Sequence, residues 1–178
     1  MVGTYNANSM FYGCTSLTGV NITLGATALT NYCYRYMFHG CTSLVNANLN
    51  LPCTSLSQYC YEYMYDGCTH LTTPPTIAAT TLNNYCMWYM FQNCTSLVES
   101  PILKGTALKN YCYQGMFKGC SSLNKITSYF TTTPSNSYTK DWVTGVPTVS
   151  TGQYLRRGSY TTRGTNAIPT NWVISTAP

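Results

Sequence analysis

The chain has 178 residues, of which 7% are charged, 44% hydrophobic and 14% aromatic, with a formal net charge of +5. A typical soluble domain carries about 25% charged residues, so Thr, Ser, Asn and Tyr replace charge here. The composition excludes an intrinsically disordered chain, and because no apolar run is long enough for a transmembrane helix we expect no membrane insertion. A neutral polar surface favours an exposed, assembled or adhesive protein over a cytosolic enzyme.

Charge is distributed unevenly along the chain. Residues 1–103 contain one cation and three carboxylates, whereas residues 104–178 contain eight cations and one carboxylate. A basic end can contact anionic glycans, nucleic acid or an acidic partner, or it can be a solvated face. Because no basic helix, zinc finger or RNA-binding motif accompanies it, we expect no nucleic-acid partner.

Internal repeats dominate the first two thirds of the chain. The segment MFYGCTSL at 10–17 returns as MFHGCTSL, MYDGCTHL, MFQNCTSL and MFKGCSSL, so a marker cysteine recurs every 26 or 27 residues. The marker cysteines are Cys14, Cys41, Cys68, Cys94 and Cys120, and a second cysteine precedes four of them by eight residues. One such repeat is too short to bury its own apolar face, so successive repeats must pack on each other. The period therefore predicts a solenoid of about five coils.

Each coil is predicted to have two different sides. The stretch after the marker cysteine, such as SLTGVNITL at 16–24, is β-prone and should form one short parallel strand per coil. Pro74, Pro75 and Pro101 remove hydrogen-bond donors, so their strands should be brief. The stretch NYCYRYMFHGC at 31–41 has apolar residues three or four apart and a glycine near its end, which predicts a short helix or 3-10 turn.

Residue rows across the repeats indicate which side chains point inward. Rows that keep one residue type, such as those of Met90, Phe91 and Leu97, should form the core. Rows that change freely should face solvent. These variable rows are Arg35, Glu62, Trp88 and Gln114, and His39, Asp66, Gln92 and Lys118.

Residues 126–178 leave the period. A Thr/Ser-rich connector is followed by two β-prone pieces that contain Trp142 and Trp172. Because an open solenoid end exposes core and strand edges, we expect a small, irregular, β-rich C-terminal cap. The predicted organisation is therefore a solenoid at 1–125 and a cap at 126–178.

The ten cysteines allow two interpretations. Nine of them follow the repeat phases, as buried hydrophobic thiols would, whereas the pairs eight residues apart could also form disulfides within a coil. A metal site is not expected, because no close cysteine pair is present and only His39 and His70 are available.

Catalysis is not expected either. No cysteine stands beside a base in a setting independent of the repeats, and the acids are too few to indicate a glycosidase pair, although Glu62 and Asp66 lie four residues apart. No phosphate-binding or zinc-protease motif occurs. The chain is therefore predicted to be a non-enzyme without a cofactor; a glycan-active enzyme is the least favoured alternative.

The motif M-F-x-G-C-T-S-L and the leucine that follows it, over about residues 5–125, resemble the BspA-type leucine-rich repeats of bacterial surface proteins and of phage proteins of gut bacteria. The resemblance implies a leucine-rich-repeat solenoid used for adhesion or display, without catalysis. The C-terminal segment also resembles the one that often follows such repeats. Met in place of the usual alanine before the Phe, and the second cysteine, mark a Tyr/Cys-rich subfamily.

Tyrosines supply the candidate binding surface. They recur in three rows, and at least one row should stack in the core while another could form an exposed ridge. We expect partner contacts from the turn side, because its aromatic residues flank a variable row. The predicted contact residues are Tyr34, Tyr36, Tyr61, Tyr63, Trp88, Tyr89 and Tyr113.

The predicted function is non-enzymatic display or adhesion. The first residues carry no basic start or apolar stretch of a secretory signal, so we expect a phage virion component, which lysis releases without a leader. A bacterial cell-surface adhesin module is the alternative. In either setting the expected partners are proteins or host-surface glycans, and we expect a homo-oligomer or a larger assembly.

Overall fold

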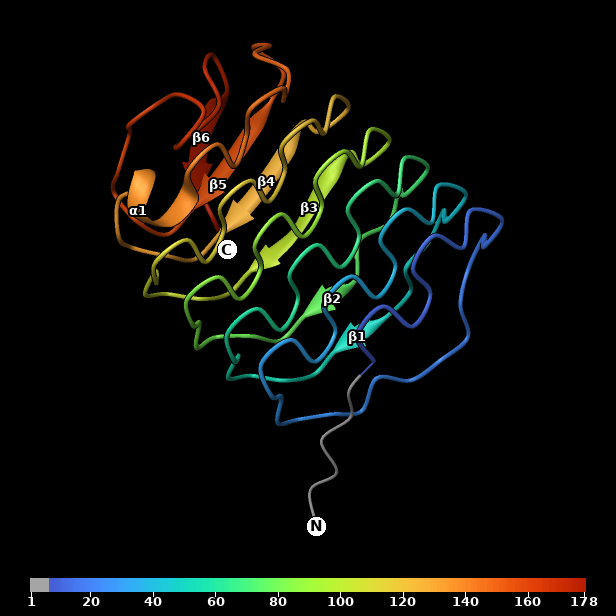
Figure 1. The fold of residues 1–178 in the computed structure, drawn as a ribbon. Helices are drawn as coiled ribbons and strands as arrows, with labels where there is room; N and C mark the ends of the chain where they lie inside the picture. Colours follow the sequence, from blue (N-terminus) through green and yellow to red (C-terminus); the bar gives the residue numbers. More distant parts are fainter. Residues whose placement is uncertain (1–6) are drawn as a thin grey trace.

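The computed structural model describes residues 7–178, in which successive repeats form a stack of coils (Figure 1). Strands lie side by side along one side of the stack, and turns occupy the opposite side. The strands are β1 (Asn50–Leu51), β2 (Thr76–Ile77), β3 (Glu99–Leu103), β4 (Lys125–Ser128), β5 (Gln153–Arg156) and β6 (Val173–Thr176). Residues 1–6 of the predicted solenoid lie outside the described part. No helix in the described part is long and apolar enough to cross a membrane.

All the named strand pairs are parallel, as predicted. β1 and β2 form one sheet, β3-β4-β5-β6 form a second, and isolated parallel bridges extend the ladder into the earlier coils. β2 is only two residues long after Pro75, as expected. The expectation for Pro101 is wrong: β3 is the longest strand, because a register shift between Glu99 and Ile102 accommodates the proline.

The expectation of a short helix or 3-10 turn in each repeat is wrong. The only helix among residues 7–178 is α1 (Asn136–Thr139), which lies beyond the repeats. In the repeats the turn side has an alternating hydrogen-bond pattern instead. The amides of Arg35 and Met37 donate three residues back within their own coil, whereas those of Tyr34 and Tyr36 donate forward to Cys60 and Glu62 of the next coil. Each coil is thereby bonded to its neighbour through every second residue.

Left-handed backbone conformations explain why no helix forms. The predicted glycine position has positive φ in each repeat, at +71° in Gly40 and 58° in Asn93, which replaces the glycine. Tyrosines four and eight residues earlier also have positive φ, as Tyr32 (63°) and Tyr36 (56°) do. An L-residue in this region costs about 1–2 kcal/mol, and we attribute its tolerance here to the coil-to-coil hydrogen bonds and ring stacking.

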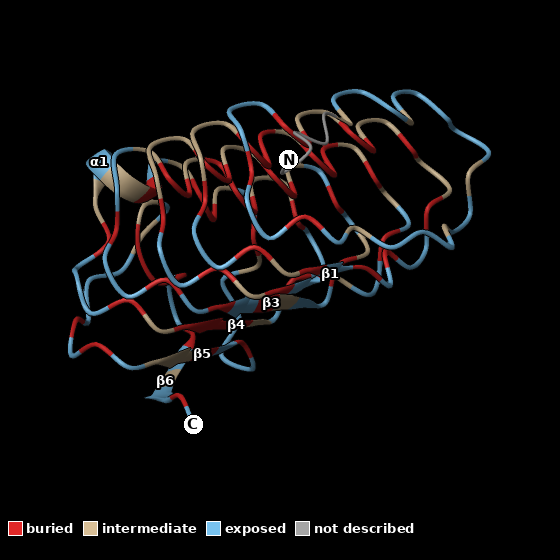
Figure 2. Ribbon diagram, turned by 90° about the horizontal axis from the view of Figure 1, so that it is seen from below, coloured by how far each residue is buried: buried red, intermediate tan, exposed pale blue. Residues whose placement is uncertain are grey.

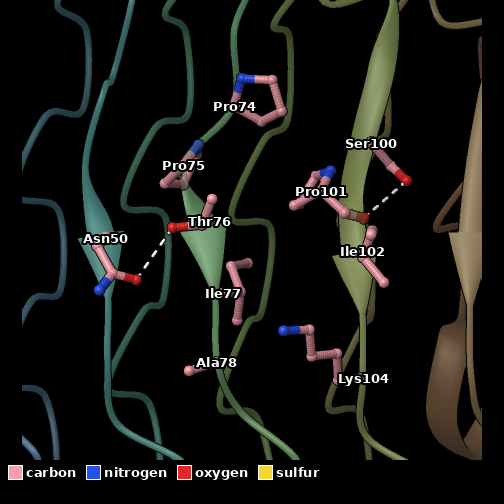
Figure 3. A pocket seen from close by; sticks show the side chains of 10 residues that line it. All are labelled: Asn50, Pro74, Pro75, Thr76, Ile77, Ala78, Ser100, Pro101, Ile102 and Lys104. Carbon is pink, nitrogen blue, oxygen red and sulfur yellow. Dashed lines mark hydrogen bonds between the residues drawn. The ribbon is translucent and has the colours of Figure 1, made fainter.

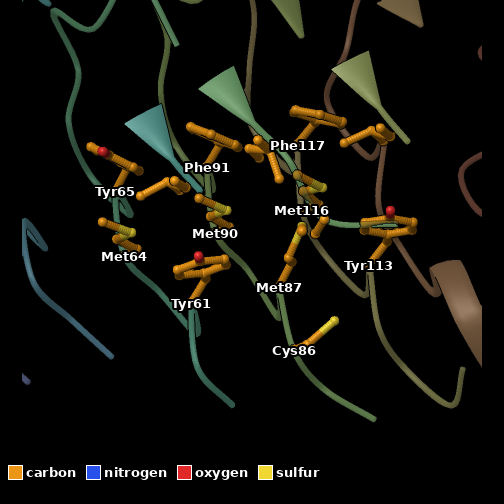
Figure 4. Close-up of a cluster of buried hydrophobic side chains, with 14 of the residues drawn as sticks. Tyr61, Met64, Tyr65, Cys86, Met87, Met90, Phe91, Tyr113, Met116 and Phe117 are labelled. Carbon is orange, nitrogen blue, oxygen red and sulfur yellow. The ribbon is translucent and has the colours of Figure 1, made fainter. Parts of the chain in front are cut away.

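The core consists of rows of identical or similar side chains between the strands and the turn side. Figure 4 shows Tyr65, Phe91 and Phe117 in one such row and methionines in another. Their rings stack with centroids 5.4 and 5.9 Å apart. Buried segments, in red, line the interior of the stack (Figure 2). The first described coil is the exception, because Met10 is 61% exposed while the later methionines of its row are buried.

The C-terminal segment continues the stack although its sequence leaves the period. β5 and β6 extend the sheet that β3 and β4 begin. On the turn side, Phe117 donates its backbone N–H to Trp142, whose ring lies 5.9 Å from that of Phe117. Trp142 is fully buried and its indole N–H donates to the carbonyl of Ala167. Residues 126–178 therefore pack in register on the last repeat.

Candidate functional site

The structure separates the seven predicted contact residues into two groups. Tyr36, Tyr63, Trp88 and Tyr89 lie half-exposed on the turn side. Tyr34, Tyr61 and Tyr113 are 3%, 1% and 0% exposed and belong to the core, so their assignment to a surface ridge is corrected. The physical reason is that the turn side points two successive residues inward and the next two outward, and this inward row directly follows a buried cysteine.

A row outside the predicted set completes the surface. Tyr59, Tyr85 and Tyr111 are half-buried and Tyr32 is exposed, so all four reach the turn side. We define the tyrosine strip as this row, the row of Tyr36, Tyr63 and Tyr89, and the variable row between them, which contains Arg35, Glu62, Trp88 and Gln114. The recurrence of Tyr32 and its equivalents was visible in the sequence, but nothing there distinguished this row from the buried one.

Both tyrosine rows are stacked along the axis. Ring centroids in the Tyr32 row are 4.9, 4.9 and 5.2 Å apart, and those in the Tyr36 row are 5.2 and 5.1 Å apart. The planes within each row differ by at most 22°. The faces of the inner rings, Tyr59, Tyr85 and Tyr63, are therefore covered by neighbouring rings, which leaves mainly their edges and hydroxyls accessible.

Arg35 and Glu62 form an ion pair inside the variable row. Arg35 Nε lies 2.7 Å from Glu62 Oε2, and Arg35 Nη2 donates to Oε1 at 3.2 Å. The guanidinium also lies 4.6 Å from the ring centroid of Tyr36. Glu62 is only 1% exposed, so the expectation that it faces solvent is wrong. Burial raises the pKa of Glu62, and Arg35 opposes part of that rise.

Trp88 takes the corresponding place in the next coil. Its ring centroid lies 5.4 to 6.3 Å from those of four surrounding tyrosines, which are Tyr59, Tyr63, Tyr85 and Tyr89. Its buried indole N–H has no hydrogen-bond acceptor. Gln114 follows in the last repeat and donates to the hydroxyl of Tyr89 at 3.3 Å. The variable row therefore changes from charged to aromatic to amide along the axis.

The second variable row is also less exposed than expected. Asp66 is buried, and the prediction that it faces solvent is wrong. His39 Nδ1 lies 3.2 Å from its carboxylate, and Gln92 donates to the same group at 3.2 Å. Burial raises the pKa of Asp66, and the hydrogen bond from Gln92 and the charge of His39 lower it in part. Neighbouring coils thus bury the carboxylate of Asp66, although the residue type in its row changes from coil to coil as in a solvent-facing row.

All ten cysteines are free, and nine of them are buried. Cys41, Cys68, Cys94 and Cys120 donate to backbone carbonyls of the preceding coil at 3.0 to 3.1 Å. Burial raises the pKa of Cys41 to about 11 and that of Cys120 to about 12. Of the two interpretations of the cysteines, the structure supports the first: the marker cysteines after Cys14 form a row of buried, free thiols, which we call the thiol ladder. Among residues 7–178, no three His, Cys, Asp or Glu side chains lie together as a metal site requires.

A shallow groove of about 280 Å³ lies where the two sheets meet (Figure 3). It is lined by Pro74 and Pro75, which precede β2, and by Pro101 and Ile102 of β3. β2 and β3 are not hydrogen-bonded neighbours, and proline, which lacks an N–H, accounts for the interruption. The hydroxyls of Thr76 and Ser100 in the groove are already hydrogen bonded to protein atoms.

Comparison with known proteins assigns the repeats. The family model described as the BspA type leucine rich repeat region matches residues 4–123 in six copies. Neither a curated protein nor a solved structure matches the chain. The matched residues cover more than half of the chain and contain the whole tyrosine strip, so this protein belongs to the BspA-type leucine-rich repeat family.

Proposed function

We propose that this protein is a non-enzymatic structural or adhesion protein of a phage virion surface, and that it contacts protein or glycan partners through the tyrosine strip. The observation that carries the proposal is the strip itself, in which stacked tyrosine rows border a row whose chemistry changes from coil to coil. A constant frame with variable side chains lets a scaffold change specificity without changing its core.

Family membership supports the general part of the proposal. BspA-type repeat proteins are commonly associated with surfaces and adhesion, and leucine-rich repeats commonly mediate protein contacts. The assignment to a virion surface in particular goes beyond family membership and is part of our proposal. A bacterial cell-surface adhesin remains the second candidate, because the same repeat family occurs there.

The chemistry of the strip and of the core thiols beneath it supports binding over catalysis. Its carboxylate, Glu62, is held by Arg35, and the thiols of Cys41 and Cys120 have raised pKa values that keep them protonated at neutral pH. A thiolate is the nucleophilic form of cysteine, so these groups are poor nucleophiles. We therefore propose no enzymatic activity and no cofactor.

The exposed ring edges favour a protein partner over sugar stacking. Carbohydrate stacking on tyrosine needs a free ring face, and the faces of the central rings Tyr59 and Tyr63 are covered on both sides. Ring edges with hydroxyls suit the wet, hydrogen-bonded contacts of protein interfaces. A second copy of the chain is one such partner, and sedimentation of the purified protein would reveal a homo-oligomer.

Immunogold electron microscopy tests where the protein is displayed. Antibody labelling of intact phage particles is the expected result, whereas labelling of the bacterial envelope alone would favour the adhesin alternative. Label confined to the interior of cells would contradict both.

Hydroxyl deletions test the binding surface. Replacing Tyr32, Tyr59 and Tyr85 by Phe together should weaken binding to the particle or cell surface at least about tenfold, since each lost partner hydrogen bond removes about 0.5–1.5 kcal/mol. The thermal midpoint should change little, because the stacked rings remain. Tyr65→Phe is the matched control, since that hydroxyl is buried in the core. Equal binding by both variants would remove the strip from the proposal.

A further inference from the structure

A second polar site lies at the C-terminal end of the stack, away from the tyrosine strip. A pocket of about 150 Å³ is lined by Arg156, the last residue of β5, by Arg157 and Gly158 after it, and by Ile174, Ser175 and Thr176 of β6. Arg156 and Thr176 are directly paired across these parallel strands. Arg156 and Thr176 therefore lie on the same face of the sheet, beside the same small cavity.

The three arginines of this region differ in what they bind. Arg157 lies 3.6 Å above the ring of Tyr129 and donates to the carbonyl of Pro178 at 2.7 Å. Arg163 donates to the carbonyls of Pro169 and Trp172. Both hold backbone in place, so their structural roles are accounted for within the protein.

Arg156 has no such acceptor. Its Nε is buried without a hydrogen-bond partner, and its only described contact is with the ring of Tyr160, 5.4 Å away. No carboxylate forms an ion pair with it in residues 7–178, and Asp141 is the only acid after residue 103. A buried guanidinium N–H normally finds an acceptor in protein, water or a ligand, so this group is free to bind an acceptor from outside the protein.

We propose that this pocket binds an oxyanion, a sulfate or carboxylate group carried by an anionic glycan. Guanidinium groups bind such anions through paired N–H donors, and Thr176, which pairs with Arg156 and shares its face of the sheet, supplies a hydroxyl donor. The excess of cations in residues 104–178 attracts the same class of ligand over a longer range. The oxyanion site stands independently of the tyrosine strip; only the choice of a glycan as its carrier rests on the proposed surface function.

Titration with inorganic sulfate tests the site itself. Amide resonances of Gly158, Ser175 and Thr176 in the full chain should shift saturably when sulfate replaces chloride at constant ionic strength. Arg156→Gln should weaken sulfate binding about tenfold or more, while Lys140→Gln, which removes the same charge from an exposed turn-side position, should change it less than about twofold. Arg156→Lys, which keeps the charge but loses the planar fork, should fall between them.

Two outcomes would overturn the site. Shifts that grow linearly without saturation would indicate general screening, and equal weakening by Arg156→Gln and Lys140→Gln would indicate a diffuse charge effect. Arg156→Lys keeps the charge, so it tests the site even if Arg156→Gln fails to fold. If the folded Arg156→Lys variant binds sulfate as tightly as the unchanged protein, recognition by the guanidinium is contradicted.

The carrier is tested with oligosaccharides of matched length. Sulfated and uronic-acid oligosaccharides should displace sulfate, and a neutral oligosaccharide should not; whichever of the first two binds more tightly identifies the anionic group. Displacement only by inorganic phosphate or by a single-stranded oligonucleotide would contradict a glycan carrier. The triple Tyr→Phe variant of the strip should bind sulfate normally, so failure of the strip and failure of the pocket give different results.

Discussion

Individual cysteines show how burial controls reactivity in this protein. Cys14 belongs to the same row as four buried marker cysteines, yet it is exposed because no described coil precedes its own. The other nine thiols lie inside the stack, and burial raises the pKa of most of them, including Cys33 and Cys112. Reactivity toward alkylating agents follows the thiolate form and its access to solvent.

Alkylation should therefore distinguish one thiol from nine. Iodoacetamide at pH 8 should label Cys14 alone in the native protein and all ten cysteines after denaturation without a reducing agent. Peptide mass spectrometry gives the labelled positions. Protected cysteines in the denatured, unreduced sample would reveal disulfides and contradict the thiol ladder.

Tyr65 carries an unsatisfied hydroxyl in the phenylalanine row of the core. It is fully buried between Phe38 and Phe91, and its hydroxyl has no hydrogen-bond partner. Tyr65→Phe should therefore raise the free energy of unfolding by about 1 kcal/mol, measured by urea denaturation.

Tyr154→Phe provides the matched comparison. Its buried hydroxyl accepts from Ser128 at 3.1 Å and lies 3.3 Å from that of Tyr160, so removing it should lower the free energy of unfolding by about 1 kcal/mol. If both substitutions destabilise to the same extent, the hydroxyl of Tyr65 is not an unsatisfied group.

At the scale of elements, the turn side depends on residues in left-handed conformation. Gly67 has φ +74°, and a Cβ there would lie 3.7 Å from the backbone of Gly40, which is ordinary contact. Gly115 has φ +61°, but a Cβ there would overlap the ring of Tyr89. A residue with a Cβ would therefore meet the same backbone strain at both positions, but only at Gly115 would it also collide with a neighbouring side chain.

Alanine substitutions should separate strain from crowding. Gly67→Ala should cost about 1–2 kcal/mol from conformation alone, and Gly115→Ala should cost more because the ring of Tyr89 must move. Gly25→Ala, with open space and no positive φ, should stay within about 0.5 kcal/mol. Thermal or urea unfolding measures all three, and equal costs at Gly67 and Gly115 would show that Tyr89 yields freely.

The turn elements also show where sequence reasoning stopped. The repeat period correctly predicted parallel strands and the inward rows of Met90, Phe91 and Leu97. The same reasoning wrongly predicted a helix on the turn side. There, two inward-pointing residues alternate with two outward-pointing ones, and this four-residue repeat is close to the 3.6-residue period of a helix. Glycine and Asn93 signalled their left-handed positions, whereas Tyr32 and Tyr36 gave no such signal, since tyrosine seldom adopts that conformation.

The candidate surface was predicted only in part for a related reason. Rows of tyrosine recur with equal regularity whether they point inward, as Tyr61 does, or outward, as Tyr63 does, so recurrence alone cannot separate them. Likewise Glu62 and Asp66 occupy variable rows, but adjacent coils cover them. The lack of a partner for Arg156 Nε depends on which acceptors surround it, which no single sequence reveals.

Across the whole molecule, the two buried carboxylates determine an unusual pH response. Burial raises the pKa of Glu62 and of Asp66, while Arg35 opposes the shift for the first and Gln92 and His39 oppose it for the second. Because both pKa values are higher in the folded than in the unfolded state, the folded protein binds more protons between the two values. This contribution to stability grows as pH falls through the folded pKa and is complete below the unfolded pKa.

The free energy of unfolding should therefore rise, or hold steady, as pH decreases from 7 to about 4. Urea denaturation across this range measures the effect. The variant with Glu62→Gln and Asp66→Asn should show a flatter profile, since the two titrating groups are gone. A steady loss of stability from pH 7 to 4 that the double variant retains would contradict this account.

The one-way hydrogen bonding of the turn side makes the two ends of the stack electrically different. Every coil-to-coil amide there donates from the earlier coil to the later one, as from Phe11 to Met37 and from Phe91 to Met116. Each peptide group has a dipole of about 3.5 D, and dipoles aligned in one direction add. The turn side therefore carries an axial dipole, with its positive pole toward the C-terminal coils and its negative pole toward the N-terminal ones. An anion that approaches the turn side is drawn toward one particular end of it.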